Sequence, residues 1–239
     1  MTATQPGTGE ASWGIGNAIS TAGAILFSHF GPFFGTALVA SVPTLVFDYL
    51  VPGSFIFRSI VDLIVGQIVS VTLVYGSMQA LRGRQVTIGE CLSEGLKRLG
   101  AALGVAILSG IGIFLGLVVL IVPGLILGTM WAVAVPAAVI EGRSSTAALS
   151  RSQELTSGRR WRVFGAYLVA LLLVLVGGMI IEGILAVIAG INTTASLVGQ
   201  WAFSALFETF TACLVTTLYY YLRREKEGVE IHEIAAVFD

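Results

Sequence analysis

The chain has 239 residues, of which 56% are hydrophobic and 11% are charged, and its mean hydropathy is +0.91. A soluble globular domain carries about 25% charged residues, so this composition excludes that class and indicates an integral membrane protein. The formal net charge of −1 provides no field that would attract nucleic acid, and we expect no nucleic-acid partner. The apolar runs are long and continuous, unlike the alternating segments of about 10 residues in membrane barrels. The sequence therefore predicts an all-α membrane protein.

The chain begins with a polar, Gly-containing stretch at residues 1–11, which we predict to be a mobile tail. Ser12 is the predicted N-cap of an amphipathic helix over 12–30, because apolar residues recur there at helical spacing. Gly31-Pro32 is predicted to end this helix and to separate it from the first membrane span.

Six segments are long and apolar enough to cross a bilayer as helices. They lie at about 33–50, 54–81, 101–122, 125–140, 163–189 and 197–222. Val51-Pro52-Gly53 and Val122-Pro123-Gly124 are predicted to turn the chain in the first two hairpins, since Pro followed by Gly suits a type II turn. Residues 191–194 are predicted to form the polar turn of the third hairpin. The third span also carries glycines that predict close helix packing: Gly100, Gly104, Gly110, Gly112 and Gly116.

Two further amphipathic helices are predicted, one before each of the last two hairpins. Thr87-Ile88-Gly89-Glu90 is a capping-box pattern that begins a helix over 87–99, in which Glu94 and Arg98 are spaced for an ion pair. The other helix, over 144–158, leads into the basic-aromatic sequence Arg159-Arg160-Trp161-Arg162. Together with the helix over 12–30, these elbow helices divide the chain into three units, each an elbow helix followed by a hairpin.

The basic residues predict the orientation in the membrane, because Lys and Arg mark the cytoplasmic side. Of the 13 Lys and Arg residues, only Arg58 lies away from the side that holds Arg82, Arg84, Lys97, Arg98, Arg143, Arg151, Arg159, Arg160, Arg162, Arg223, Arg224 and Lys226. We expect both termini and all elbow helices in the cytoplasm of a prokaryotic cell, with the chain in the plasma membrane. Trp161 and Tyr219-Tyr220-Tyr221 are predicted to form an aromatic belt at this interface. A single membrane domain over 12–228 would then precede a short cytoplasmic helix over 229–239.

Charged residues concentrate at the elbow between the fourth and fifth spans. Basic clusters beside a membrane attract anionic lipid head groups, so this surface is one candidate site. Its residues are Glu141, Arg143, Arg151, Glu154, Arg159, Arg160 and Arg162. The alternative interpretation is that Glu141 pairs with an elbow arginine and that the remaining arginines only fix the topology.

Four ionisable residues fall inside the predicted spans, where a charge costs about 2.5–3.5 kcal/mol on insertion scales. They are Arg58, Asp62, Glu182 and Glu208. Counted along their helices, all four lie in the outer half of the bilayer, and Asp48 lies at its rim. We predict that they meet there. They would form either a polar cavity for a cation or a proton, or a buried Arg58–Asp62 pair with both glutamates hydrogen-bonded or protonated.

Two parts of the chain resemble a known family. The first part is residues 129–169, with the motif residues Pro136, Val139-Ile140-Glu141-Gly142, Ala148-Leu149-Ser150-Arg151-Ser152, Leu155, Gly158 and Trp161. The second part is residues 219–238, with the motif Tyr221-Leu222-Arg223-Arg224-Glu225-Lys226-Glu227-Gly228. In these motifs the chain resembles the membrane-domain family of glycerophosphoryl diester phosphodiesterases and its free-standing relatives. The resemblance implies a multi-span helical domain without established catalytic residues. The sequence leaves no room for a phosphodiesterase barrel of about 250 residues, so we do not expect hydrolase activity.

No catalytic or metal-binding constellation is predicted, and no cofactor is expected. His29 and His232 are isolated, and Cys91 and Cys213 lack the spacing of metal ligands. Two functions remain open. The first is a non-enzymatic module that uses its elbow helices to organise or bind membrane lipids, a partner protein or a second copy of itself. The second is a small transporter that uses the polar cavity. Helices broken near the middle of the membrane would favour transport, and Pro43 is the best candidate for such a break.

Overall fold

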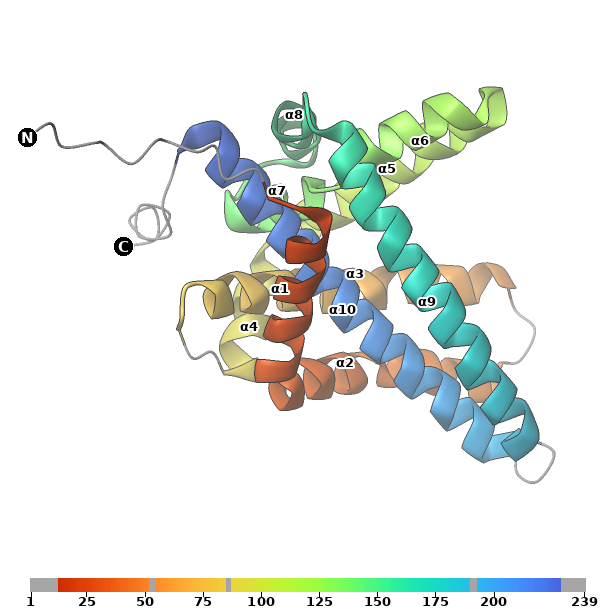
Figure 1. Cartoon of the computed structure of the whole chain (residues 1–239). Coiled ribbons are helices and arrows are strands. Elements are labelled where there is room, and N and C mark those ends of the chain that lie inside the picture. The colour runs from red at the N-terminus through yellow and green to blue at the C-terminus, as the bar shows by residue number, and fades with distance from the viewer. Residues whose placement is uncertain (1–12, 52–54, 85–86, 190–192, 229–239) are drawn as a thin grey trace, which may run out of the picture.

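The computed structural model describes residues 13–51, 55–84, 87–189 and 193–228. Across these ranges the chain forms ten α-helices and no strands (Figure 1). The helices are α1 (Ile15–Ser28), α2 (Phe30–Leu50), α3 (Phe55–Leu81), α4 (Ile88–Lys97), α5 (Leu99–Val119), α6 (Ile121–Met130), α7 (Ala134–Ile140), α8 (Ser145–Thr156), α9 (Arg160–Ala189) and α10 (Thr193–Glu227). Six segments, with α6 and α7 counted as one, are long and apolar enough to cross a membrane. The predicted all-α class and the six candidate spans are confirmed. Residues 1–11, Ser12 and the predicted helix over 229–239 lie outside the described residues.

Three hairpins diverge from a common base. In Figure 1 the connected ends of α2–α3, α5–α6 and α9–α10 lie on the right, and the short helices α1, α4, α7 and α8 lie on the left. Helix α10 is central, since it packs against α1, α2, α3, α7, α8 and α9. Its fully buried Leu214, Leu218, Tyr219 and Leu222 all lie toward its C-terminal end. The core therefore lies at the base, whereas the hairpin ends present apolar side chains such as Phe55, Phe114 and Val187 outward, as a lipid solvent permits.

The first elbow helix ends earlier than predicted. Only His29 separates α1 from α2, and Gly31 and Pro32 lie inside the first turn of α2. A proline is tolerated there because the first backbone N–H groups of a helix have no partner within it. The prediction that Gly31-Pro32 separates these helices is wrong. Helix α2 also continues through Pro43, so the break expected there does not occur.

The second hairpin turns at Leu120, and the prediction of a turn at Val122-Pro123-Gly124 is wrong. That tripeptide begins α6, and Gly124 is needed for close helix packing. A Cβ added at Gly124 would lie 2.8 Å from the backbone N of Leu117, and one added at Gly116 would lie 2.9 Å from Cα of Gly124. Helices α5 and α6 therefore touch backbone to backbone, in the manner of small-residue contacts in membranes.

The fourth span, predicted to be continuous over 125–140, is interrupted between α6 and α7. Residues Trp131, Ala132 and Val133 do not continue the helix, and α7 beyond them is buried along almost its whole length. Pro136 lies four residues after Ala132, so it has no N–H to donate to the Ala132 carbonyl, and its ring would clash with that carbonyl in a continuous helix. Pro136 therefore breaks the span, and contacts from elsewhere in the chain satisfy the backbone groups at the break.

Helix α8 and the start of α9 provide those contacts. The Ser152 hydroxyl donates to the carbonyl of Met130 at 2.7 Å and accepts from the N–H of Val133 at 3.2 Å. The Tyr167 hydroxyl donates to the carbonyl of Ala132 at 2.8 Å. Non-helical backbone at membrane depth needs protein partners of this kind. The third elbow helix is thus a structural support for the fourth span.

Helix α4 begins as predicted. The Thr87 hydroxyl accepts from the Glu90 N–H at 3.3 Å, and the Glu90 carboxylate accepts from the Thr87 N–H at 3.1 Å, which completes the capping box. The predicted pairing of Glu94 with Arg98 is wrong. Glu94 instead pairs with Lys97 at 2.5 Å, while the Arg98 guanidinium lies beside Gly142, where a Cβ would approach it to 2.9 Å. Along the chain, each elbow helix precedes a pair of candidate spans, as predicted.

Candidate functional site

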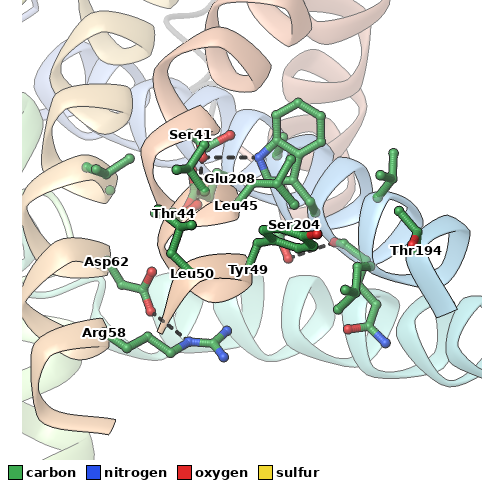
Figure 2. Close-up of a pocket in the computed structure, with 18 residues that line it drawn as sticks. Ser41, Thr44, Leu45, Tyr49, Leu50, Arg58, Asp62, Thr194, Ser204 and Glu208 are labelled. Atoms are coloured by element: carbon green, nitrogen blue, oxygen red, sulfur yellow. Dashed lines mark hydrogen bonds and ion pairs between the residues drawn. The ribbon is translucent and has the colours of Figure 1, made fainter. Parts of the chain in front are cut away.

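A cavity of about 640 Å³ lies between α2, α3 and α10, near the connected ends of their hairpins (Figure 2). We call it the tip cavity. Its polar lining comes from all three helices: Ser41, Thr44, Tyr49, Arg58, Asp62, Thr194, Gln200, Ser204 and Glu208. The rest of its wall is largely apolar and includes Leu45, Val46, Leu50, Val65, Leu197 and Val198. The tip cavity is therefore amphipathic, with charge and hydrocarbon surfaces side by side.

Arg58 and Asp62 stand one turn apart on α3 and form the predicted ion pair, with 3.5 Å between Nε and Oδ2 (Figure 2). The alternative of a buried pair is wrong. The rest of the protein leaves 56% of the Arg58 side chain and 47% of the Asp62 side chain exposed. The divergence of the hairpins explains this exposure, because α3 has no complete cover at its first turns. Both charged groups line the tip cavity.

Glu208 enters the tip cavity from the middle of α10. Its Oε1 lies near Gly66 of α3, where an added Cβ would be 4.0 Å away, and it experiences the charge of Asp62. Its Oε2 is buried and has no hydrogen-bond partner within the described ranges. A buried carboxylate oxygen without a donor is costly, so this atom would gain a hydrogen bond from a ligand that carries a donor.

Glu182 does not join this group. Its side chain is exposed on α9 and does not line the tip cavity, so the prediction that all four ionisable residues meet is wrong for this residue. The face of α9 on which Glu182 lies depends on how α9 packs against its neighbours. The side chain of Asp48, predicted to add a fourth acid, lies outside the described part of the structure.

Trp201 is a cavity residue that the sequence did not single out. Its indole N–H donates to the carbonyl of Ser41 at 3.2 Å, which ties α10 to α2 across the tip cavity. A tryptophan inside a span needs a partner for its N–H, and this requirement was the available signal.

At the other end of the molecule, Glu141 follows α7 and is the centre of an ion-pair network. It accepts from Nε of Arg143 at 2.5 Å, from Nε of Arg151 at 2.9 Å and from the hydroxyl of Tyr219 at 2.7 Å. Burial raises the pKa of this carboxyl, but the hydrogen bonds from Tyr219, Arg151 and Arg143 outweigh burial and hold the pKa below its usual value. The structure thus contains the pairing of Glu141 with an elbow arginine.

The other elbow charges are mostly paired with the end of α10. Arg151 contacts Glu227, which also accepts from Arg223 at 2.8 Å. Arg159 and Arg162 approach Glu225 to 2.6 and 3.7 Å. The remaining predicted residues lie at the margins of this network: Arg151 reaches Glu154 at 3.6 Å, and Nε of Arg160 is buried without a hydrogen-bond partner among the described residues. The alternating charges of Arg223-Arg224-Glu225-Lys226-Glu227 were the signal that the sequence reasoning did not use.

Of the four residues predicted to form an aromatic belt, Trp161 is the most exposed. Trp161 is 85% exposed, as expected of a residue at a membrane interface. Tyr219 and Tyr220 are buried, and Tyr221 stacks on Trp13 with 6.0 Å between the ring centroids. The three tyrosines are therefore packing residues, and their place in the belt was a wrong prediction.

Comparison with known proteins identifies a family. The family model described as "Domain of unknown function (DUF7847)" matches residues 18–222. No match was found among curated proteins or among solved structures. The matched range includes α2 to α9 in full and reaches Leu222 in α10, so it contains the tip cavity together with Glu141 and Arg151.

Proposed function

Since the chain belongs to the family described as a domain of unknown function (DUF7847), we propose that this domain is a non-enzymatic membrane protein that binds an amphipathic molecule in its tip cavity. The observation that carries this proposal is the cavity of about 640 Å³ with Arg58, Asp62 and Glu208 in an otherwise largely apolar wall. Ligand pockets usually measure about 300–1,000 Å³ and combine an apolar lining with a few polar groups. The tip cavity has both properties.

The elbow helices are weaker candidates for the binding site. The arginines expected to hold an anionic head group are engaged with Glu141, Glu225 and Glu227. A ligand phosphate would have to compete with these carboxylates. We therefore assign the elbow network a structural role, in which it holds α8 against the end of α10. Trp161, exposed beside Arg162, favours contact of this surface with the bilayer.

Binding is better supported than transport. The broken fourth span is the feature that would favour a transporter, but its carbonyls at Met130 and Ala132 already accept hydrogen bonds from Ser152 and Tyr167. An ion that bound at the break would have to displace these hydrogen bonds to reach the two carbonyls. None of the residues around it lines the tip cavity.

For the orientation, we propose that α1, α4 and α8 face the cytoplasm of a prokaryotic cell and that the tip cavity lies at the outer side of its plasma membrane. Every Lys and Arg residue of the chain except Arg58 belongs to the base or to its connections.

Tyr49→Cys should react with a membrane-impermeant maleimide on intact cells, and Ser150→Cys should react only after the cells are opened. The native cysteines are buried and provide the unreactive background. The reverse labelling pattern would contradict the orientation.

The binding function is tested by native mass spectrometry of the full chain, purified in mild detergent from its native membrane. We expect a retained amphipathic molecule that is lost in Gly66→Leu, where the new side chain enters the tip cavity beside Glu208. Ser204→Leu tests the same cavity from α10. Gly110→Leu is the matched control, because nothing lies within 4 Å of an added Cβ on that face of α5. Equal retention by all folded variants, or no retained molecule in the unsubstituted protein, would refute the proposal.

A further inference from the structure

We propose that the ligand of the tip cavity bears a primary ammonium group bound by Glu208 and an adjacent anionic group bound by Arg58, as in the head group of an aminophospholipid. The inference rests on the proposed function and names the chemistry of its ligand. It follows from the acceptor left unsatisfied in the cavity, from the charges around it, and from the apolar wall.

The first step concerns hydrogen bonding at Glu208. A carboxylate is an acceptor only, and the Oε2 atom is buried without a donor among the described residues. A ligand that brings a donor removes the cost of burying such an atom. A primary ammonium has three N–H groups and a positive charge, so it satisfies the hydrogen-bonding and the electrostatic requirement together. A trimethylated ammonium has no N–H and satisfies only the second.

The second step concerns the charge of the cavity. Two carboxylates, Asp62 and Glu208, line it against one guanidinium, that of Arg58, which favours a positively charged ligand group on the Glu208 side. Arg58 pairs with Asp62 through Nε at 3.5 Å, and a guanidinium has five N–H donors in all. A phosphate bound at Arg58 would share this guanidinium with Asp62. Arg58 lines the cavity from α3, next to Asp62 in Figure 2, whereas Glu208 lines it from α10.

The third step concerns the source of the ligand. Leu50 of α2 and Val198 of α10 both line the tip cavity, and 68% and 45% of their surfaces are not covered by the rest of the protein. In a membrane, such residues at the mouth of a cavity face lipid. A head group can therefore enter the cavity while its acyl chains remain in the bilayer along α2 and α10. This arrangement favours a lipid over a water-soluble zwitterion of the same chemistry.

The test compares four probes on the full chain in detergent, by native mass spectrometry and by titration. They are dioctanoyl phosphatidylethanolamine, its phosphatidylcholine and phosphatidylglycerol analogues, and free phosphoethanolamine. We expect the ethanolamine lipid to bind about tenfold more tightly than the other two lipids, the ratio expected for one hydrogen bond to a charged group. Glu208→Gln should remove this preference, so that the ethanolamine and choline lipids bind with equal affinity. Glu182→Gln, an exposed acid outside the cavity, should bind like the unsubstituted protein.

The outcomes separate the two proposals. Equal affinity for the ethanolamine and choline lipids, or an unchanged preference in folded Glu208→Gln, overturns the ammonium assignment. If Gly66→Leu still abolishes binding of both lipids, the tip cavity remains the binding site. If none of the probes binds and purified protein carries no amphipathic molecule, the proposed function itself fails. Binding of free phosphoethanolamine with the affinity of the lipid, and with the same dependence on Glu208, supports the ammonium chemistry and assigns it to a soluble ligand.

Discussion

Glu141 and Arg151 form an ion pair across the elbow, with 2.9 Å between Oε1 of the glutamate and Nε of the arginine. The side chains are only 9% and 13% exposed, so the pair is largely shielded from water. Glu141 ends the fourth span, and Arg151 lies on α8 and also contacts Glu227 at the end of α10. Arg151 therefore joins its own helix, α8, to the end of α7 and to the end of α10.

Replacing Arg151 with Gln should strongly destabilise the protein. The largely buried Glu141 carboxylate would keep Arg143 and the Tyr219 hydroxyl but lose its most buried cation, and breaking a buried pair costs up to about 3–5 kcal/mol. Arg143→Gln is the matched control, because 43% of this side chain is exposed and exposed pairs contribute about 0–1 kcal/mol. The melting temperatures of the two variants in detergent should differ clearly. Equal melting temperatures would mean that the network does not stabilise the elbow.

The stability of the protein should fall as the pH drops through the acidic range. The folded pKa of Glu141 is depressed, so its contribution is fully present above the unfolded pKa of about 4.3 and is lost as the pH falls toward the folded value. Melting curves recorded from pH 7 downward should therefore show a decline that begins near the unfolded pKa. In Glu141→Gln the melting temperature at pH 7 should be lower, and this part of the decline should be absent. An identical pH profile for both proteins would contradict the assignment.

Ser152→Ala should destabilise the break between α6 and α7. Its hydroxyl donates to the Met130 carbonyl and accepts from the buried Val133 N–H. The Met130 carbonyl would keep a hydrogen bond from Thr156 at 3.3 Å, but the Val133 N–H would lose this partner, and leaving such a group unpaired costs about 1–3 kcal/mol. Ser150→Ala on the exposed face of the same helix controls for helix propensity and should change little. The measurement is thermal unfolding together with hydrogen exchange at residues 131–133. Unchanged exchange in Ser152→Ala would show that α8 does not hold the break.

Gly116→Ala should separate α5 from α6. The added methyl would lie 2.9 Å from Cα and 3.0 Å from N of Gly124, and backbone atoms cannot move aside as a flexible side chain can. Overpacking of this kind costs about 1–3 kcal/mol. Gly110→Ala on the open face of the same helix should be neutral or slightly stabilising, because alanine favours the helix. The sign of the difference in melting temperature between the two variants tests the contact.

The sequence was sufficient for features that depend on local composition. The six spans follow from apolar length, and the capping box at Thr87 and Glu90 follows from residues three apart. The packing glycines were also predicted in part: added methyl groups at Gly104, Gly112 and Gly116 would meet neighbours, whereas none would at Gly100 and Gly110. Helical spacing alone does not say which face of α5 meets α6.

Features that depend on tertiary contacts were not predictable. Pro136 favours the break at Trp131–Val133, but the hydroxyl groups of Ser152 and Tyr167 that satisfy the backbone there lie outside the span. In the tip cavity, the depth of Asp62 and Glu208 was read from their positions along the spans. The direction of Glu182 was not, because it depends on the rotation of α9 about its own axis. The pairing of Arg151 with Glu227 required knowledge of where the end of α10 lies.

The interrupted fourth span also has a consequence for the order in which the protein is made. The Met130 carbonyl and the Val133 N–H receive their partner from Ser152, which is synthesised later by 22 and 19 residues, and the Ala132 carbonyl waits a further stretch for Tyr167, 35 residues on. A growing chain that has inserted only α5, α6 and α7 therefore holds unpaired backbone groups at membrane depth. The second hairpin therefore reaches its final form only after α8 and the first turns of α9 have left the ribosome. Ser152 and Tyr167 of the third unit then complete the hydrogen bonds of the second unit.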